Sequence, residues 1–438
     1  MKTRTYHLLL ITLLMGSMLS CTSSPDADTS DKAVVVYECN ERLFAQTKAF
    51  QSIESYVDEL AQMQVNVLWL MPIHPIGTKN AVGSPYCVKN YRTINPAFGT
   101  MDDLKSLVHT CHSKQIRVIL DFVANHTSWD HPWVTAHPDW YQEAQTSDEK
   151  MWNDVTFLDY SKQEVCDSMT ACMVYWIDEA DIDGFRCDYA HGVPNTFWQQ
   201  AITAIRKAKP DAFLLAETQN AGLYTAGFDL LYSWNYLTAI ENLYSGKSSV
   251  QSLLSTSNSE FRNTPEGKER LRYVTTHDEC SEKAPKDIFK TAQGELSAFC
   301  LTIFLGGVPM IYSSQEIGYM EKINFFNYKI LSFAKPAGPQ VEARQAYEQL
   351  MKAYQDTRTL RKGTKTAGDL DQRVPYVEYV LGERRLLVVC NAVNEAKTVN
   401  LPAAYQNAKV SDKKSGETVT LSSTLSLSAY DYKIYQLN

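Results

Sequence analysis

Short apolar runs alternate with amphipathic stretches from residue 33 to about residue 312. The apolar runs have the length of buried strands and are rich in Val, Ile and Leu. Between them, apolar residues recur at helical spacing, as at Leu104, Leu107, Val108 and Cys111. The predicted strands span residues 34–37, 65–70, 116–122, 182–187, 212–216, 228–231, 271–275 and 308–312. Eight strands that alternate with helices predict an α/β fold, a parallel sheet closed into a (β/α)8 TIM barrel.

Two regions depart from this alternation. Residues 126–160, between the third and fourth predicted strands, hold several tryptophans but no clear periodicity. A connection of this length is typical of a functional lid or a small domain, so we expect a short inserted subdomain after the third strand. Its tryptophans either pack the segment onto the barrel, which is the plainer interpretation, or form a platform for a ligand. From residue 365 to 438, β-type alternation around Gly382 predicts a C-terminal antiparallel β-sandwich domain, which leaves residues 33–364 to the barrel.

The N-terminus has the pattern of an export signal. Lys2 and Arg4 precede an apolar run from Leu8 to Leu19 that is too short to span a bilayer as a helix. The run ends in the letters MLSC, and this ending resembles a bacterial lipobox, which implies cleavage before Cys21 and lipidation of that cysteine. An ordinary cleaved signal peptide with an incidental cysteine is the alternative.

We therefore expect residues 1–20 to be a lipoprotein signal peptide. Residues 21–32 are mostly small, polar and acidic, which is typical of a flexible tether. The protein is then exported and lipid-anchored in the cell envelope, at its periplasmic or cell-surface face.

Cysteine usage and charge exclude several classes of protein. The cysteines other than Cys21 are irregularly spaced and contain no C-x-x-C pair, so we expect neither a disulfide framework nor a zinc site. The formal net charge is -8, and no basic stripe offsets it, which argues against a nucleic-acid partner. We expect a monomer.

Polar side chains cluster where four of the predicted strands end. In a TIM barrel the catalytic groups sit at the C-terminal ends of the strands. Asp188 and Glu217 are 29 residues apart, about one βα unit, and Glu217 and Asp278 are 61 apart, about two. A single Asp at a strand end is more often a helix N-cap, but three carboxylates with an Arg and two His in consistent register favour a catalytic site on one rim. The polar strand-end residues are Asp121, Asn125, His126, Arg186, Asp188, Glu217, His277 and Asp278.

These four segments resemble the four signature regions of the α-amylase family of glycoside hydrolases. Residues 67–77 (VLWLMPIHPIG), and the stretch from 83 through 100, resemble the family's first barrel segments. Residues 158–160 (LDY) resemble the short motif that closes the family's inserted domain. Each motif alone is a modest signal, but all of them in order and at barrel spacing are a strong one. The resemblance covers most of residues 33–360.

The resemblance implies a role for each matching residue. Asp188 matches the nucleophile, Glu217 the general acid/base and Asp278 the transition-state stabiliser. Arg186 lies two residues before Asp188, so both side chains point to the same face of the strand, and a cation there would hold Asp188 ionised. The residues matched to substrate contacts are Arg186, Asp121, His126, His277 and Tyr86.

This set of groups suits the cleavage of a glycosidic bond. In a retaining enzyme one carboxylate attacks the anomeric carbon, a second protonates the leaving oxygen, and the two are about 5–5.5 Å apart. Glu217 must start protonated, which requires a pKa raised by the apolar residues 214–216 and by nearby carboxylates. We therefore expect a retaining hydrolase of starch-like α-glucans or malto-oligosaccharides that requires no cofactor.

Three features depart from the family's pattern. Many members place Lys-His three and four residues after the nucleophile, whereas here His191 is one place early and the lysine is absent, so the +1 subsite is not implied. Thr276 stands where Asn is common, with no expected catalytic consequence. Asn125 matches a residue that often binds structural Ca²⁺, with Asp154 and Asp159 as further candidates. A hard-cation site needs six or more oxygens, so with a short inserted segment Ca²⁺ is the less expected outcome.

Other functions fit parts of this pattern. A transglycosidase or glucan isomerase would share the covalent intermediate, and the acceptor alone would decide the outcome. A catalytically silent glucan-binding protein of a surface uptake complex, or a structural partner on the barrel fold, is the alternative from another class. The presence of three carboxylates together with Arg186 argues against both of these, because binding alone does not require the full set.

Overall fold

The computed structural model describes residues 32–333 and 335–438. The predicted signal peptide, Cys21 and most of the predicted tether lie outside the described residues. Within them, no helix has both the length and the apolar character that crossing a membrane would require.

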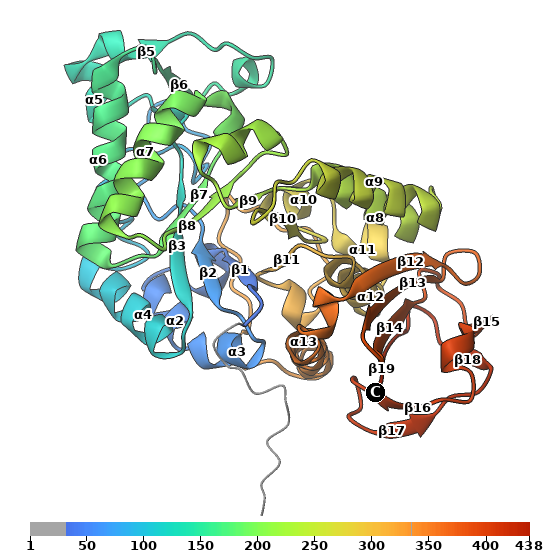
Figure 1. Ribbon diagram of the computed structural model, residues 1–438. Helices are drawn as coiled ribbons and strands as arrows, with labels where there is room; N and C mark the ends of the chain where they lie inside the picture. Colours follow the sequence, from blue (N-terminus) through green and yellow to red (C-terminus); the bar gives the residue numbers. More distant parts are fainter. Residues whose placement is uncertain (1–31, 334) are drawn as a thin grey trace, which may run out of the picture. The chain divides into compact units, whose positions relative to one another are not determined.

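Eight parallel strands close into a barrel in the order β1-β11-β10-β9-β8-β7-β3-β2, as the sequence predicts (Figure 1). All eight overlap the predicted runs, but β10 ends three residues earlier than expected. It pairs with β9, which has only two residues, through Glu269 and Arg270, so the pairing begins before the predicted start at Leu271. The barrel strands are β1 (Val36–Cys39), β2 (Val67–Leu70), β3 (Arg117–Phe122), β7 (Gly184–Cys187), β8 (Phe213–Ala216), β9 (Leu230–Leu231), β10 (Glu269–Arg272) and β11 (Val308–Tyr312).

Amphipathic helices surround the barrel strands. In α4 the predicted positions Leu104, Leu107, Val108 and Cys111 are all buried, and a capping box that begins at Thr100 satisfies its first turn. The longer helices are α4 (Met101–Ser113), α6 (Gln163–Ala180), α7 (Asn195–Ala208), α8 (Trp234–Tyr244), α9 (Val250–Arg262), α12 (Ala292–Phe304) and α13 (Pro339–Asp356). Shorter ones are α1 (Glu41–Phe44), α2 (Ala49–Glu54), α3 (Val57–Gln62), α5 (Pro132–Ala136), α10 (His277–Glu282) and α11 (Pro285–Phe289).

The inserted segment between β3 and α6 folds into a small three-stranded antiparallel sheet, teal at the top of Figure 1. Its strands are β4 (His126–Ser128), β5 (Tyr141–Gln142) and β6 (Val155–Leu158), and β6 lies in the middle. Strands of two to four residues are too short to give a recognisable alternation, which explains why the sequence shows no periodicity here.

The C-terminal strands form a six-stranded sheet and a two-stranded sheet around their own apolar core. The predicted hairpin around Gly382 is present as β13 (Pro375–Leu381) and β14 (Arg384–Cys390). The other strands are β12 (Thr364–Asp369), β15 (Lys397–Asn400), β16 (Lys409–Asp412), β17 (Thr418–Thr420), β18 (Thr424–Leu427) and β19 (Tyr432–Leu437). Residues of β13, β14 and β19 also join the main core, which they share with the barrel.

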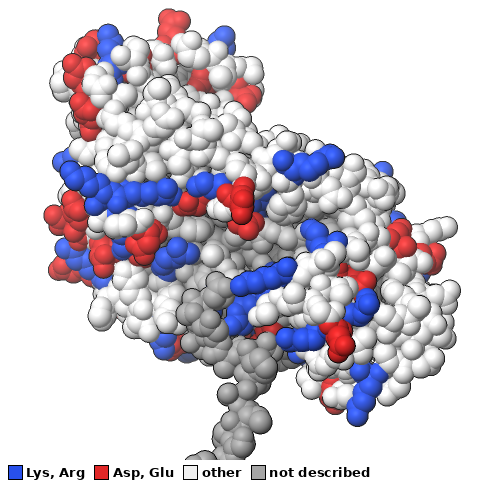
Figure 2. All heavy atoms as spheres, in the orientation of Figure 1, with Lys and Arg blue, Asp and Glu red and all other residues white. Residues whose placement is uncertain are grey.

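The nine cysteines among the described residues are all unpaired and buried. On the face shown in Figure 2, acidic and basic side chains are interspersed and much of the surface is uncharged.

Candidate active site

A cavity of about 380 Å³ lies where the barrel strands end and the inserted segment covers them. Six of the residues matched to catalysis or substrate contacts line it: Tyr86, His126, Asp188, Glu217, His277 and Asp278. Arg186 and Asp121, which are fully buried, contact these residues from below. The structure therefore brings together side chains from the β2–α4 loop and from the ends of β3, β7, β8 and β10.

Arg186 joins the carboxylates of the site. Its Nη1 lies 2.8 Å from Asp121 Oδ1 and 2.7 Å from Asp188 Oδ1, and its Nη2 lies 3.1 Å from Glu217 Oε2. The guanidinium is fully buried and lies 5.0 Å from the ring of Trp69. One buried cation thus holds three carboxylates in place, which excludes large separations between Asp188 and Glu217.

Glu217 follows β8 (Phe213–Ala216), whose four residues are buried. Burial raises the pKa of the Glu217 carboxyl, the charge of Asp188 raises it further, and Arg186 opposes both. The Tyr189 backbone N–H donates to Glu217 Oε2 at 2.6 Å and fixes the orientation of the carboxyl group. A raised pKa is the direction that a general acid needs near neutral pH.

Asp188 lies directly after β7 (Gly184–Cys187) and accepts a hydrogen bond from Arg186. Burial raises the pKa of Asp188, and the attraction of Arg186 works in the opposite direction. Arg186 is therefore the main group that favours the ionised form of Asp188. Burial raises the pKa of Asp121, which shares this guanidinium, to about 7.

His277 is held between three polar side chains, those of Glu38, Tyr86 and Asp278. Its Nδ1 contacts Glu38 Oε1 at the end of β1, and its Nε2 lies 2.8 Å from Tyr86 Oη and 3.4 Å from Asp278 Oδ2. Burial lowers the pKa of His277, but Asp278 and Glu38 outweigh it and raise the pKa to about 10. Tyr86 Oη also donates to Asp121 Oδ2 at 3.0 Å, so these hydrogen bonds extend to the Arg186 cluster.

Asp278 lies in the first turn of α10, with its side chain half exposed to the cavity. Thr276 is the N-cap of this helix, and its hydroxyl accepts a hydrogen bond from the Asp278 N–H at 3.2 Å. The threonine that departs from the family pattern therefore has a structural role in placing Asp278.

His126 lines the cavity from β4, and burial lowers its pKa to about 4. The edge of its ring meets Trp152 at a centroid distance of 5.6 Å, and Trp152 also packs edge-on against Tyr189 at 4.9 Å. Trp152 thus lines the cavity, which corrects the interpretation that the tryptophans of the inserted segment only pack it onto the barrel. Trp140 does follow that interpretation, because it is buried in the main core.

Glu38, Tyr189, Phe325 and Phe326 also contribute to the site, although none was among the candidate residues. The signal for Glu38 was present, since it follows a predicted strand as a polar residue in an apolar setting. Phe325 and Phe326 belong to a long connection without any motif, and no sequence signal identifies them. His191 is exposed and packs against the Tyr189 ring at 4.2 Å, outside the cavity lining.

The residues considered for Ca²⁺ do not form a common site. The Asn125 amide donates to Glu149 Oε1 at 3.2 Å, and Asp159 accepts from the Ser161 N–H at 2.9 Å. Asp154 instead lines the active-site cavity. Among residues 32–333 and 335–438, no group of three His, Cys, Asp or Glu side chains is arranged to hold a metal ion.

The chain resembles known proteins over most of its length. The family model described as "Alpha amylase, catalytic domain" matches residues 45–157 and 149–377. A cyclomaltodextrinase of Geobacillus thermopakistaniensis is 25% identical over 88% of this chain and 69% of its own length. Alpha-amylase 3 of Dictyoglomus thermophilum is 27% identical over 42% of this chain, and the match spans only 43% of that relative.

Solved structures of α-amylases share the fold of this chain. A maltogenic α-amylase from Thermotoga neapolitana is 26% identical, with a TM-score of 0.79 over 92% of this chain and 98% of its own. An α-amylase from Lactobacillus plantarum is 22% identical, with a TM-score of 0.81 over 92% and 99% of the two chains, and at this identity it supports the fold alone. Since the family match extends over more than half of the sequence, the chain belongs to the α-amylase family of glycoside hydrolases.

Proposed function

We propose that this protein is a retaining glycoside hydrolase that cleaves α-glucosidic bonds in starch-like glucans or malto-oligosaccharides. The observation that carries the proposal is the contact of both Asp188 and Glu217 with one guanidinium, that of Arg186. Retaining enzymes hold their two carboxyl groups about 5–5.5 Å apart, whereas inverting enzymes separate them by about 6.5–9.5 Å to admit a water molecule. Contact with a single side chain supports the closer arrangement.

In the first step, Asp188 attacks the anomeric carbon as the bond to the leaving oxygen breaks, and Glu217 gives its proton to that oxygen. A covalent glycosyl-Asp188 ester results. In the second step, Glu217 takes a proton from water, the water oxygen attacks the same carbon, and the bond to Asp188 breaks. Two inversions leave the anomeric configuration unchanged.

The surrounding groups prepare these steps. Arg186 favours the ionised form of Asp188 against the effect of burial, while burial and the charge of Asp188 favour the protonated form of Glu217. Two neighbouring carboxyl groups therefore take different roles. Asp278 offers a negative charge at the edge of the cavity, where it stabilises positive charge as it develops on the sugar.

Glu38 is a positioning residue in this proposal. Its carboxylate accepts the Nδ1 proton of His277 and, together with Asp278, favours the doubly protonated ring. Nε2 then also carries a proton, which it donates to Tyr86 Oη at the cavity wall.

Glucans are the proposed substrates because several relatives of this chain carry the names of enzymes that act on glucans. Relatives are named α-amylase and cyclomaltodextrinase, and a further one of Picrophilus torridus is named α-1,4-glucan:maltose-1-phosphate maltosyltransferase, at 30% identity over 38% of this chain. That third name keeps transfer to a sugar acceptor as a second candidate function. The covalent step is common to both, and the acceptor distinguishes them.

Two substitutions test the catalytic roles. We expect Asp188→Asn to lower kcat on maltoheptaose by about 10⁴-fold or more, because no ester can form. We expect Glu217→Gln to lower activity on natural glucans about 10²- to 10⁴-fold, but to spare aryl glucosides with activated leaving groups, which do not need protonation. Asp211→Asn, an exposed carboxylate before β8, is the matched control and should keep full activity.

Product analysis then separates hydrolysis from transfer. Incubation with amylose, pullulan and maltotriose, followed by chromatography, shows whether shorter glucans alone appear or longer ones as well. Unchanged turnover by Asp188→Asn, or equal losses by Glu217→Gln on both kinds of substrate, would contradict the assigned roles.

A further inference from the structure

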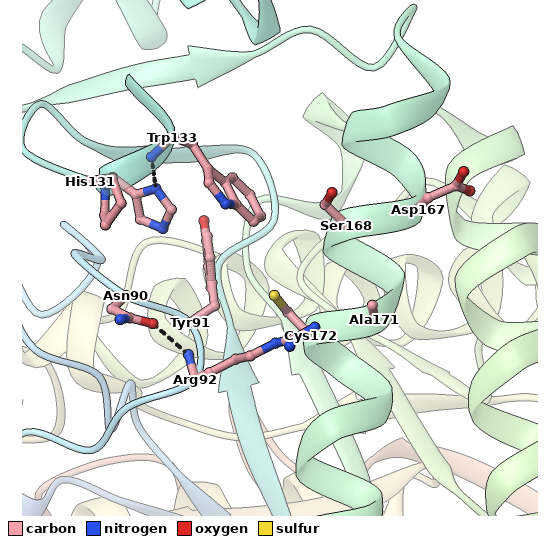
Figure 3. A pocket seen from close by; sticks show the side chains of 10 residues that line it. Asn90, Tyr91, Arg92, His131, Trp133, Asp167, Ser168, Ala171 and Cys172 are labelled. Carbon is pink, nitrogen blue, oxygen red and sulfur yellow. Dashed lines mark hydrogen bonds between the residues drawn. The ribbon is translucent and has the colours of Figure 1, made fainter. Parts of the chain in front are cut away.

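A second cavity, of about 530 Å³, lies between the loop after β2, helix α5 of the inserted segment and helix α6 (Figure 3). No residue that lines it also lines the active-site cavity. Nothing in the proposed catalytic steps uses it. Its lining combines aromatic, amide, hydroxyl and charged groups, which is the composition of a binding pocket rather than of a packing defect.

Trp133 forms the aromatic wall of this cavity. Its partly buried indole packs against His131 at 4.7 Å and Trp140 at 5.3 Å, so the ring is held rigidly. Figure 3 shows the ring between Tyr91 and α6. The indole N–H has no hydrogen-bond partner among the described residues, so it is available to a ligand.

Polar residues of two other elements also line the cavity. Asn90 and Arg92 lie on the loop after β2, and Ser168 and Asp167 lie on α6 (Figure 3). The Asp167 carboxylate points away from Trp133 and accepts hydrogen bonds from the side chains of Gln163 and Gln200. The Asn90 side-chain oxygen accepts from the Arg92 N–H at 2.9 Å, which leaves its NH₂ group free to donate. The Ser168 hydroxyl has no hydrogen-bond partner in the part of the chain that the structure describes. Donors and acceptors therefore both remain available around the aromatic wall.

These groups select the chemistry of the ligand. The Arg92 guanidinium packs on the Tyr175 ring at 5.5 Å, and Asp167 Oδ1 already accepts from two glutamine amides, so neither charge makes the cavity a site for an anion or a cation. A fully apolar ligand would leave the Asn90 NH₂ group and the Ser168 hydroxyl of the lining without partners. A neutral ligand with many hydroxyl groups satisfies both requirements, because a sugar ring has a C–H face for Trp133 and adjacent hydroxyls for the polar groups.

We propose that this cavity is a second binding site for the α-glucan chain. The inference rests on the proposed function for the kind of sugar. The inserted segment contributes to both cavities, through residues 131–133 here and residues 151–155 at the active site. A polymer held at the second cavity keeps other segments of itself at high effective concentration near the active site.

The test is binding of the full chain, made inactive by Asp188→Asn, to starch granules and to maltoheptaose. Co-sedimentation measures the granule-bound fraction, and calorimetry measures the dissociation constant for maltoheptaose. Adding Trp133→Ala should lower granule affinity at least about fivefold, and Trp133→Phe should restore part of it. Ser168→Phe fills the cavity from α6 without removing any packing, and should have the same effect as Trp133→Ala if the latter folds poorly.

Two control variants lie outside the cavity. Trp129→Ala removes another tryptophan of the inserted segment, and Asp178→Phe adds a ring at an exposed position of α6. Both should bind starch as the parent does. Unchanged granule binding by Trp133→Ala and Ser168→Phe, or no granule binding by the Asp188→Asn chain, overturns the second site. Turnover of maltoheptaose by the unmodified chain, measured alongside, shows separately whether the proposed function holds.

Discussion

His277 is the residue whose chemistry depends most on its neighbours. Glu38 and Asp278 raise its pKa to about 10, although burial acts in the opposite direction. Because the pKa in the folded state lies above the ordinary value of about 6.5, protonated His277 contributes stability that is fully present below pH 6.5. That contribution is lost as the pH rises toward 10.

We expect Glu38→Gln to move the pKa of His277 from about 10 toward 6.5, because the neutral amide still accepts the Nδ1–H bond but no longer stabilises the charge. Labelled-histidine NMR titration measures this pKa, with His277→Asn to assign the resonance. The midpoint temperature of unfolding should consequently fall between pH 6 and 9.5 in the parent more than in the variant.

The control is Glu41→Gln, which replaces a buried carboxyl group on α1 that makes no hydrogen bond or ion pair with His277 among the described residues. It should leave the His277 titration unchanged. A His277 resonance that titrates at the same pH in the parent and in Glu38→Gln would remove Glu38 from its positioning role.

The sequence predicted those site residues that belong to a motif. It missed those that reach the site only through tertiary packing. Asp188, Glu217 and Asp278 follow strands at the spacing of βα units, so the strand order of a barrel was enough to bring them to one cavity. Glu38 lies near the end of β1, directly after the predicted strand 34–37, but a single acidic residue in a short apolar run did not stand out. Trp152 contacts His126 and Tyr189 through loops whose paths no periodicity encodes.

At the scale of elements, apolar runs predicted the eight barrel strands because each is buried on both faces. The boundary of β10 was wrong because its neighbour β9 is so short that pairing, rather than sequence, sets where β10 begins. The three strands of the inserted segment were not predicted, since pairing between distant short segments decides them. Local patterns therefore determine long elements, and tertiary pairing determines short ones.

The pairing of strands β7 and β8 depends on a glycine at position 184. It has a φ of +144°, and a Cβ atom there would lie 2.0 Å from the Phe213 carbonyl oxygen on β8. Gly184→Ala must therefore push the two strands apart. We expect a loss of about 2–4 kcal/mol in the free energy of unfolding. We also expect a lower kcat, because Arg186 and Asp188 follow on the same strand. Denaturant unfolding and steady-state kinetics measure the two effects.

Gly267→Ala is the matched control for this prediction. Gly267 also has a positive φ, of +75°, but nothing lies within 4 Å of the position that its Cβ would take. The substitution should cost only the backbone strain, about 1 kcal/mol, and leave kcat unchanged. Equal losses in stability for both variants would show that the close approach to Phe213 is not the cause of the loss in Gly184→Ala.

At the scale of the whole molecule, the N-terminal sequence predicts where the protein resides. We propose that the chain is exported and held in the cell envelope by a lipid on Cys21. Cys21→Ser should abolish incorporation of labelled palmitate and move the protein from the membrane pellet to the supernatant, because one residue carries the whole anchor. Retention of Cys21→Ser in the pellet, with unchanged labelling, would favour another means of attachment.

The barrel and the C-terminal sheet are not independent in this structure. Residues 33–438 form one compact unit, and helix α12 is buried from Gly294 to Phe304. Tyr379 Oη of β13 donates to the Phe304 carbonyl at 2.8 Å, and the Arg373 guanidinium donates to the Leu243 and Tyr244 carbonyls. A shared apolar core with hydrogen bonds across it predicts that both parts unfold together.

A chain ending at residue 363 tests this coupling, because it removes the sheet and exposes the buried side of α12. We expect the truncated chain to be largely insoluble, since it presents a large apolar surface to water. In calorimetry the full chain should unfold in a single transition. Tyr379→Phe is the mild counterpart: it removes one cross-core hydrogen bond and should cost about 1 kcal/mol without loss of solubility. Two separate transitions in the full chain, or a soluble truncated chain with the parent's activity, would show instead that the barrel folds without the sheet.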